Sequence, residues 1–166
     1  MDNTTDMEMD PFRYMVRRLI AINSTSLIKN GSPAHARILL EEMFDSARES
    51  AYVYCGRISD KVWGGERLAR AVRAAIARKV DVRFIVQHPD EIPADSAVAA
   101  ALRESGAGAI RSGGRFLGIT SHFAVFDGKM FRFEKNDEEK TAIACVNGPE
   151  TARKLRGLAL DMLSVA

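Results

Sequence analysis

The sequence has few of the residues that would indicate a metal centre, a disulfide scaffold or a membrane segment. Its two cysteines, Cys55 and Cys145, show neither a C-x-x-C nor a Cys/His ligand spacing. Both lie in apolar runs, which predicts two reduced thiols in the core. No apolar run approaches the roughly 18 residues of a membrane span, and the acidic N-terminus does not resemble a signal peptide. We therefore expect a cytoplasmic protein without membrane association, metal or cofactor.

The chain also lacks an excess of either charge, an internal repeat and any low-complexity tract. Its 24 basic and 22 acidic residues give a formal net charge of +2, which is too balanced to predict a polyanion partner from composition. A length of 166 residues with 46% hydrophobic content suits one folding unit with its own core. Any binding of nucleic acid must therefore come from a local patch.

Hydrophobic patterning divides the chain into three parts. Residues 1–10 combine Asp, Asn, Thr and Met without a period, so we expect a flexible lead-in. Residues 11–32 are expected to hold an amphipathic helix and a short strand at 26–29. Residues 33–166 are expected to form the main domain, which begins with a helix over 33–47.

The main domain alternates strand and helix patterns. A strand at 51–55, a helix at 65–79 and a strand at 82–86 predict a right-handed crossover between parallel strands. The later expected elements are a helix at 96–104, strands at 109–111, 119–126, 129–134 and 141–146, and a helix at 149–163. This order predicts an α/β fold, a single domain whose mixed sheet is flanked by helices.

The run from Thr120 to Gly128 is the most informative stretch of the chain. It is apolar, carries His122 near its start and ends in Asp127-Gly128, a pair favoured where a hairpin turn needs positive φ. From the residues alone, Asp127 is interpreted as a turn residue. His122 is interpreted as a hydrogen-bonded histidine at the start of a strand.

The order of these elements over residues 33–165, together with this run, resembles one half of a phospholipase D superfamily protein. The family motif is H-x-K-x-x-x-x-D-G. Anchored on Asp127-Gly128, Thr120 takes the position of the nucleophilic histidine and His122 takes that of the lysine. The family also has G-S-x-N soon after the Asp-Gly pair. Here residues 132–136 read R-F-E-K-N, so only Asn136 lies near the asparagine position.

The resemblance implies a site for metal-independent phosphodiester cleavage, built from two histidines and two lysines, one pair per motif. A chain with one motif would complete that site by forming a twofold dimer. Thr120 is a poor nucleophile, because a hydroxyl is scarcely ionised at neutral pH without a paired base. The leading hypothesis is therefore a catalytically degenerate phospholipase D-like domain that acts as a homodimeric binding or assembly module. Thr120, His122 and Asp127 are its degenerate motif positions.

Two alternatives stay open at this point. The first is an altered phosphodiesterase or nuclease that uses His122 as nucleophile or base. The second is a nucleic-acid-binding module that uses the arginine-bearing helix over 67–78, although a solvated helix face explains the same pattern. Candidate contacts to phosphate or nucleic acid are Arg70, Arg73, Arg111, Arg115 and Asn136. If neither activity is found, a protein partner is the remaining hypothesis.

Overall fold

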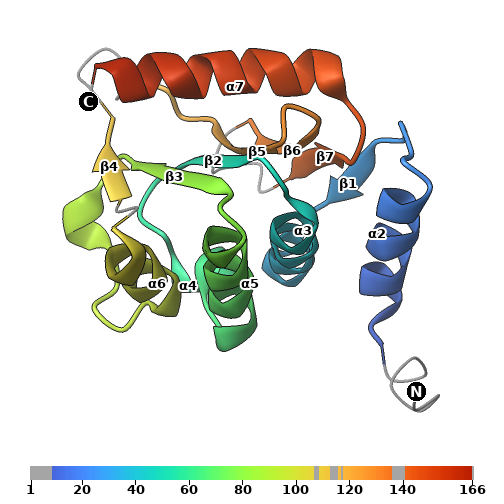
Figure 1. Ribbon diagram of the computed structural model, residues 1–166, viewed down its shortest axis with the longest axis horizontal. Coiled ribbons are helices and arrows are strands. Elements are labelled where there is room, and N and C mark those ends of the chain that lie inside the picture. The colour runs from blue at the N-terminus through green and yellow to red at the C-terminus, as the bar shows by residue number, and fades with distance from the viewer. Residues whose placement is uncertain (1–8, 107–108, 113–115, 117, 136–140, 166) are drawn as a thin grey trace.

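The computed structural model describes residues 9–106, 109–112, 116, 118–135 and 141–165, with the backbone alone for 109–111. Its centre is a seven-stranded sheet in the order β1-β7-β6-β5-β2-β3-β4 (Figure 1). Strands β2, β3 and β4 are parallel, and the other neighbouring pairs are antiparallel. The strands are β1 (Ile28–Asn30), β2 (Ser50–Cys55), β3 (Asp81–Val86), β4 (Ala109–Arg111), β5 (His122–Phe126), β6 (Met130–Glu134) and β7 (Ala142–Cys145).

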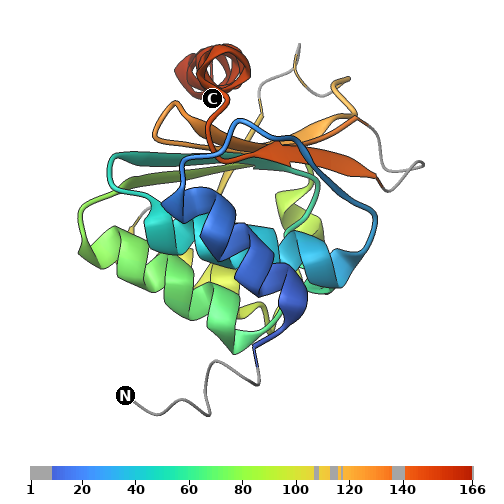
Figure 2. The same cartoon turned by 90° about the vertical axis from the view of Figure 1, so that its right-hand side faces the viewer.

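Helices cover both faces of the sheet (Figure 2). Helix α7 crosses one face, whereas α3, α5 and α6 lie on the other, and α2 packs against α3. The helices are α2 (Pro11–Ala21), α3 (Pro33–Ser46), α4 (Asp60–Trp63), α5 (Glu66–Ala77), the 3₁₀ turn η1 (Pro89–Glu91), α6 (Ala97–Ser105) and α7 (Pro149–Ser164). The predicted α/β fold with a mixed, helix-flanked sheet is confirmed. Within the described residues, no helix is long and apolar enough to cross a membrane.

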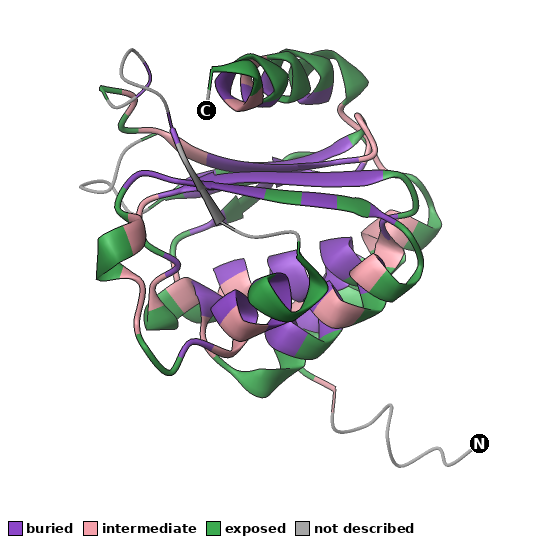
Figure 3. Cartoon of the chain, turned by 60° about the vertical axis from the view of Figure 1, so that its left-hand side comes forward, coloured by how far each residue is buried: buried purple, intermediate pink, exposed green. Residues whose placement is uncertain are grey.

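The sheet separates two hydrophobic clusters, and buried residues run along its strands and the inner helix faces (Figure 3). The larger cluster lies under α3, α5 and α6, and the smaller lies under α7. Every residue of β2 is buried, as expected for a central strand that is covered on both faces. The predicted parallel pairing of the two strands that flank α5 is confirmed, because β2 and β3 pair in parallel.

The structure differs from the predicted elements mainly where tertiary contacts set the ends. Strand β1 begins at Ile28, two residues later than expected, because pairing with β7 fixes its register. Strand β5 begins at His122, so residues 119–121 precede it. The short helix α4 and the turn η1 were not predicted, since each is too short to show a hydrophobic period. Residues 1–8 lie outside the described residues, and the domain boundary at residue 33 stays a prediction.

The two cysteines are free and buried, as predicted. Burial raises the pKa of the Cys55 thiol to about 12, so its reactive thiolate is scarce at neutral pH. We expect the native protein to resist an aromatic disulfide reagent at neutral pH, and both thiols to react after denaturation in guanidinium. Absorbance of the released thiolate measures this. A thiol that reacts at the rate of free cysteine in the native protein would contradict the described packing.

Candidate functional site

A cleft of about 630 Å³ opens where the parallel strands β2 and β3 end. Ligands of open α/β sheets bind outside the carboxyl ends of the strands, so this is the expected place for a site. We call it the carboxyl-end cleft. The polar or charged side chains that line it are Ser32, Arg57, Ser59, Lys61, Gln87, His88, Glu91, His122, Arg132 and Glu134.

His122 lies at the start of β5 and reaches this cleft. Its Nε2 is 3.3 Å from Oε1 of Gln87, which follows β3. The Gln87 amide nitrogen donates to the carbonyl of Ile119 at 2.7 Å, and this contact fixes which end of the amide faces the imidazole. The end that faces Nε2 is therefore the acceptor oxygen, and the two groups form a hydrogen bond in the tautomer that carries the proton on Nε2. In that tautomer Nε2 has no lone pair for attack on phosphorus.

Side chains hold the described residues of the segment before β5. Oη of Tyr54 lies 3.0 Å from the carbonyl oxygens of both Phe116 and Ile119. Burial raises the pKa of Tyr54, so the hydroxyl stays protonated. Ser121 donates to the carbonyl of Lys135 at 2.7 Å. Thr120 is exposed in this segment and does not line the cleft, so the structure does not bring it together with His122 in one site.

Arg132 is a site residue that the sequence analysis did not predict. It lies on β6, opposite Ala124, and points to the same face of the sheet as His122. The residue is only 9% exposed, yet it lines the cleft. Burial lowers the pKa of Arg132, although the charge and hydrogen bond of Glu134 oppose this. The available signal was a charged residue inside the apolar strand pattern Met-Phe-Arg-Phe.

Most backbone donors in the first turn of α3, which borders the cleft, are already used. Oγ of Ser32 accepts from the N–H of His35 at 3.0 Å, and the carbonyl of Ser32 accepts from the N–H of Ala36. Pro33 has no N–H. The positive charge of the cleft therefore comes mainly from side chains. Three described cations, Arg57, Lys61 and Arg132, face two described carboxylates, Glu91 and Glu134.

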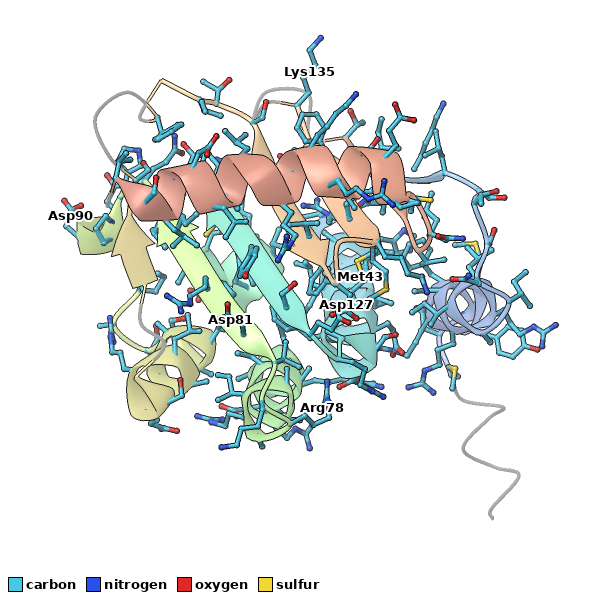
Figure 4. The ribbon with its side chains drawn as sticks, turned by 45° about the horizontal axis from the view of Figure 1, so that its top comes forward. Met43, Arg78, Asp81, Asp90, Asp127 and Lys135 are labelled. Carbon is cyan, nitrogen blue, oxygen red and sulfur yellow. The ribbon has the colours of Figure 1, made fainter. Side chains whose placement is uncertain are left out.

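Asp127 lies at the other end of β5 from His122, in the turn to β6. Figure 4 shows it at the same end of the strands as Asp81, whereas Lys135 lies at the opposite end. Asp127 and Gly128 have φ of 57° and 61°, which confirms the predicted turn. The Asp127 carboxylate accepts from the N–H groups of residues 48, 49 and 50 at 2.7–3.1 Å. It therefore anchors the segment before β2, and the structure does not place it in the cleft.

The arginines of α5 do not line the cleft, and most of them have partners. Arg70 is exposed, and Arg73 pairs with Glu104 at 3.3 Å. Arg78, labelled in Figure 4, donates to the carbonyls of residues 44 and 47 at 2.8 and 3.0 Å. The side chain of Arg111 is not described, and Arg115 and Asn136 lie outside the described residues. Within the described part of the chain, no group of three or more His, Cys, Asp or Glu residues could hold a metal.

Solved structures share this fold, whereas no family model and no curated protein matches the chain by sequence. The phospholipase D family member Nuc from Salmonella typhimurium has a TM-score of 0.60 at 18% identity, covering 84% of this chain and 95% of Nuc. NucT from Helicobacter pylori has a TM-score of 0.60 at 16% identity, with the same coverage. TrmBL2, an archaeal chromatin protein described with a novel mode of DNA binding, has a TM-score of 0.62 at 8% identity, covering 91% of this chain and 58% of TrmBL2. At these identities the likeness shows the fold, and the chain therefore has the fold of phospholipase D family structures.

Proposed function

We propose that this chain is a catalytically degenerate phospholipase D-like domain that acts as a homodimeric binding module through the carboxyl-end cleft. The hydrogen bond between His122 and Gln87 carries the proposal. It leaves Nε2 of the only imidazole in the motif as a donor. Its one N–H is donated to Gln87, and a protonated nitrogen cannot form a bond to phosphorus.

The rest of the motif supports binding without cleavage. Attack on a phosphodiester needs a nucleophile, a proton donor for the leaving oxygen and a charge that stabilises the developing oxyanion. Thr120 is exposed before β5, and its hydroxyl is almost un-ionised at neutral pH. The lysine of the motif is replaced by His122, and loss of one such donor commonly costs about 2.7–4 kcal/mol of transition-state stabilisation.

Homodimer formation is part of the proposal. This chain matches 95% of Nuc and of NucT, which supports one phospholipase D-like half per chain. A site made from two motifs then needs a second copy, brought to the first by a twofold axis. Sedimentation equilibrium is expected to give about twice the chain mass of 18.3 kDa. A monomer at every concentration up to the millimolar range would contradict this part of the proposal.

The test of lost catalysis is a cleavage assay in the presence of a chelator. We expect no turnover of a bis(nitrophenyl) phosphate ester or of single-stranded DNA above the buffer rate, and no change in the His122→Ala variant. The reason is that His122 supplies a hydrogen bond and no nucleophile. Cleavage that resists the chelator and disappears in His122→Ala would show an active phosphodiesterase instead.

Nucleic acid is a second candidate ligand, favoured by the fold shared with the DNA-binding TrmBL2. Two patches could carry it, namely Arg57 and Lys61 at the cleft, or Arg70 and Arg73 on α5. Electrostatic binding to phosphates falls steeply with salt. Replacing both residues of one pair with glutamate tells the patches apart. Arg57 and Lys61 line the cleft at the carboxyl ends of the strands, so replacing the cleft pair is expected to weaken binding more.

A further inference from the structure

We infer that Arg132 binds a phosphate group in the carboxyl-end cleft. We further infer that the carboxylate of Glu134 competes with this phosphate for the guanidinium of Arg132. The inference deepens the proposed function and rests on it, because it names the ligand class that the cleft would hold. Neither residue belongs to the motif that suggested the site.

The first observation is a buried cation with too few partners. The described residues give Arg132 one contact, from Nη2 to Oε2 of Glu134 at 3.4 Å, and none of them accepts from Nε. Charge-assisted hydrogen bonds are normally about 2.7–2.9 Å long, so this contact is weak. Buried charges in proteins are generally paired and hydrogen-bonded. A guanidinium that is nine-tenths buried, lines a cleft and lacks a full partner suits an anionic ligand.

The second observation is the register of the strands around Arg132. Its cross-strand neighbours are Ala124 on β5 and Ala144 on β7, whose methyl groups leave room above the guanidinium. His122 lies directly opposite Glu134, so all three polar side chains share one face of the sheet. The guanidinium of Arg132 therefore faces the same cleft as the imidazole of His122, whose Nε2 is already paired with Gln87.

The charge of the cleft favours phosphate over a single carboxylate. Arg57 and Lys61 add two more cations to its lining. A phosphate monoester or inorganic phosphate carries more than one negative charge at neutral pH, and guanidinium groups match its oxygens in pairs. A carboxylate brings one charge, which Glu134 already supplies. The phosphate can come from a small molecule or from the terminal phosphate of a nucleic acid.

Glu134 limits the affinity because its carboxylate lies where the ligand must approach Arg132. The side chain is 15% exposed and belongs to the cleft lining. A bound phosphate shares Arg132 with this carboxylate and is repelled by it. Glu134→Gln keeps the shape and removes the like charge, so phosphate should bind roughly tenfold more tightly.

The test is a calorimetric titration of the full chain with inorganic phosphate at fixed low ionic strength. We expect Arg132→Gln to weaken binding at least tenfold and Glu134→Gln to strengthen it roughly tenfold. Arg83→Gln is the matched control, because this substitution removes the same charge outside the cleft. Arg83 has a close ion pair with Asp81 at 2.8 Å and does not line the cleft. Equal loss in Arg132→Gln and Arg83→Gln would overturn the inference.

Two further arms keep the test decisive. If Arg132→Gln does not fold, Arg132→Lys and Glu134→Gln decide, and unchanged phosphate affinity in Glu134→Gln overturns the role of Glu134. A nucleoside monophosphate and a 5′-phosphorylated oligonucleotide of the same base are compared to identify the source of the phosphate. Failure of both, and of inorganic phosphate, to bind overturns the subsite. Failure of the proposed function is distinguishable, because it is detected as product in the cleavage assay and not as a change in phosphate affinity.

Discussion

Replacing Arg13 with alanine is expected to destabilise the protein by about 3–5 kcal/mol, because it breaks a buried ion pair from one side. Arg13 on α2 bridges Glu41 and Glu42 on α3, with Nη1 2.7 Å from Oε1 of Glu42. The two carboxylates are 3% and 5% exposed. Burial opposes the charge on Arg13, but the hydrogen bonds and charges of the glutamates outweigh it and raise its pKa. Without Arg13, two adjacent buried carboxylates lose their main cation.

Urea unfolding followed by circular dichroism measures this effect. Arg17→Ala is the matched control, because Arg17 contacts the same Glu42 at 3.0 Å but its side chain is 43% exposed. That exposed ion pair should cost only about 0–1 kcal/mol. In the background of Glu41→Gln and Glu42→Gln, removing Arg13 should cost much less than in the natural chain. Similar losses for Arg13→Ala and Arg17→Ala would contradict the described role of Arg13 in joining α2 to α3.

Replacing Asp127 with alanine is expected to lower stability by about 2–4 kcal/mol, since hydrogen bonds to a charged group are worth more than neutral ones. Three consecutive backbone N–H groups, from residues 48 to 50, donate to its carboxylate. Its φ of 57° adds to the loss, because alanine adopts the left-handed region less readily than aspartate. The aspartate of the motif, Asp127, therefore stabilises the fold by anchoring the backbone before β2.

Asp127→Asn separates the two contributions to this loss. Asparagine tolerates the positive φ and keeps one carbonyl acceptor, so about half of the loss should be recovered. Chemical unfolding measures both variants, and phosphate affinity of the folded Asp127→Asn protein should equal that of the natural chain. Natural stability in Asp127→Ala, or a selective loss of phosphate binding in Asp127→Asn, would contradict a purely structural role.

Elements with a long hydrophobic period could be predicted from the sequence, and elements defined by contacts between distant residues could not. The helix that the structure has at residues 33–46 was predicted at 33–47, because its apolar spacing and the Ser32-Pro33 start are local signals. The turn at Asp127-Gly128 was equally local. In contrast, β1 was misplaced by two residues, because only pairing with β7 sets its register.

The same distinction holds for the candidate site. His122 was found through its position before the Asp-Gly turn. Gln87, which determines the donor role of His122, lies 35 residues earlier, and no local pattern connects the two. Arg132 was missed because its burial depends on Ala124 and Ala144, which reach it only through strand pairing. A motif can therefore locate a strand without identifying the neighbours that decide its chemistry.

Whether Nε2 of His122 carries a proton decides whether this nitrogen can attack phosphorus. Nitrogen-15 NMR of the imidazole ring at neutral pH, assigned by comparison with His122→Ala, reports which ring nitrogen carries a proton. We expect a protonated Nε2 that donates to Gln87, and a change in its signal in Gln87→Ala. An unprotonated Nε2 in the natural chain would show a nitrogen that is ready for attack on phosphorus, and would contradict the loss of catalysis proposed here.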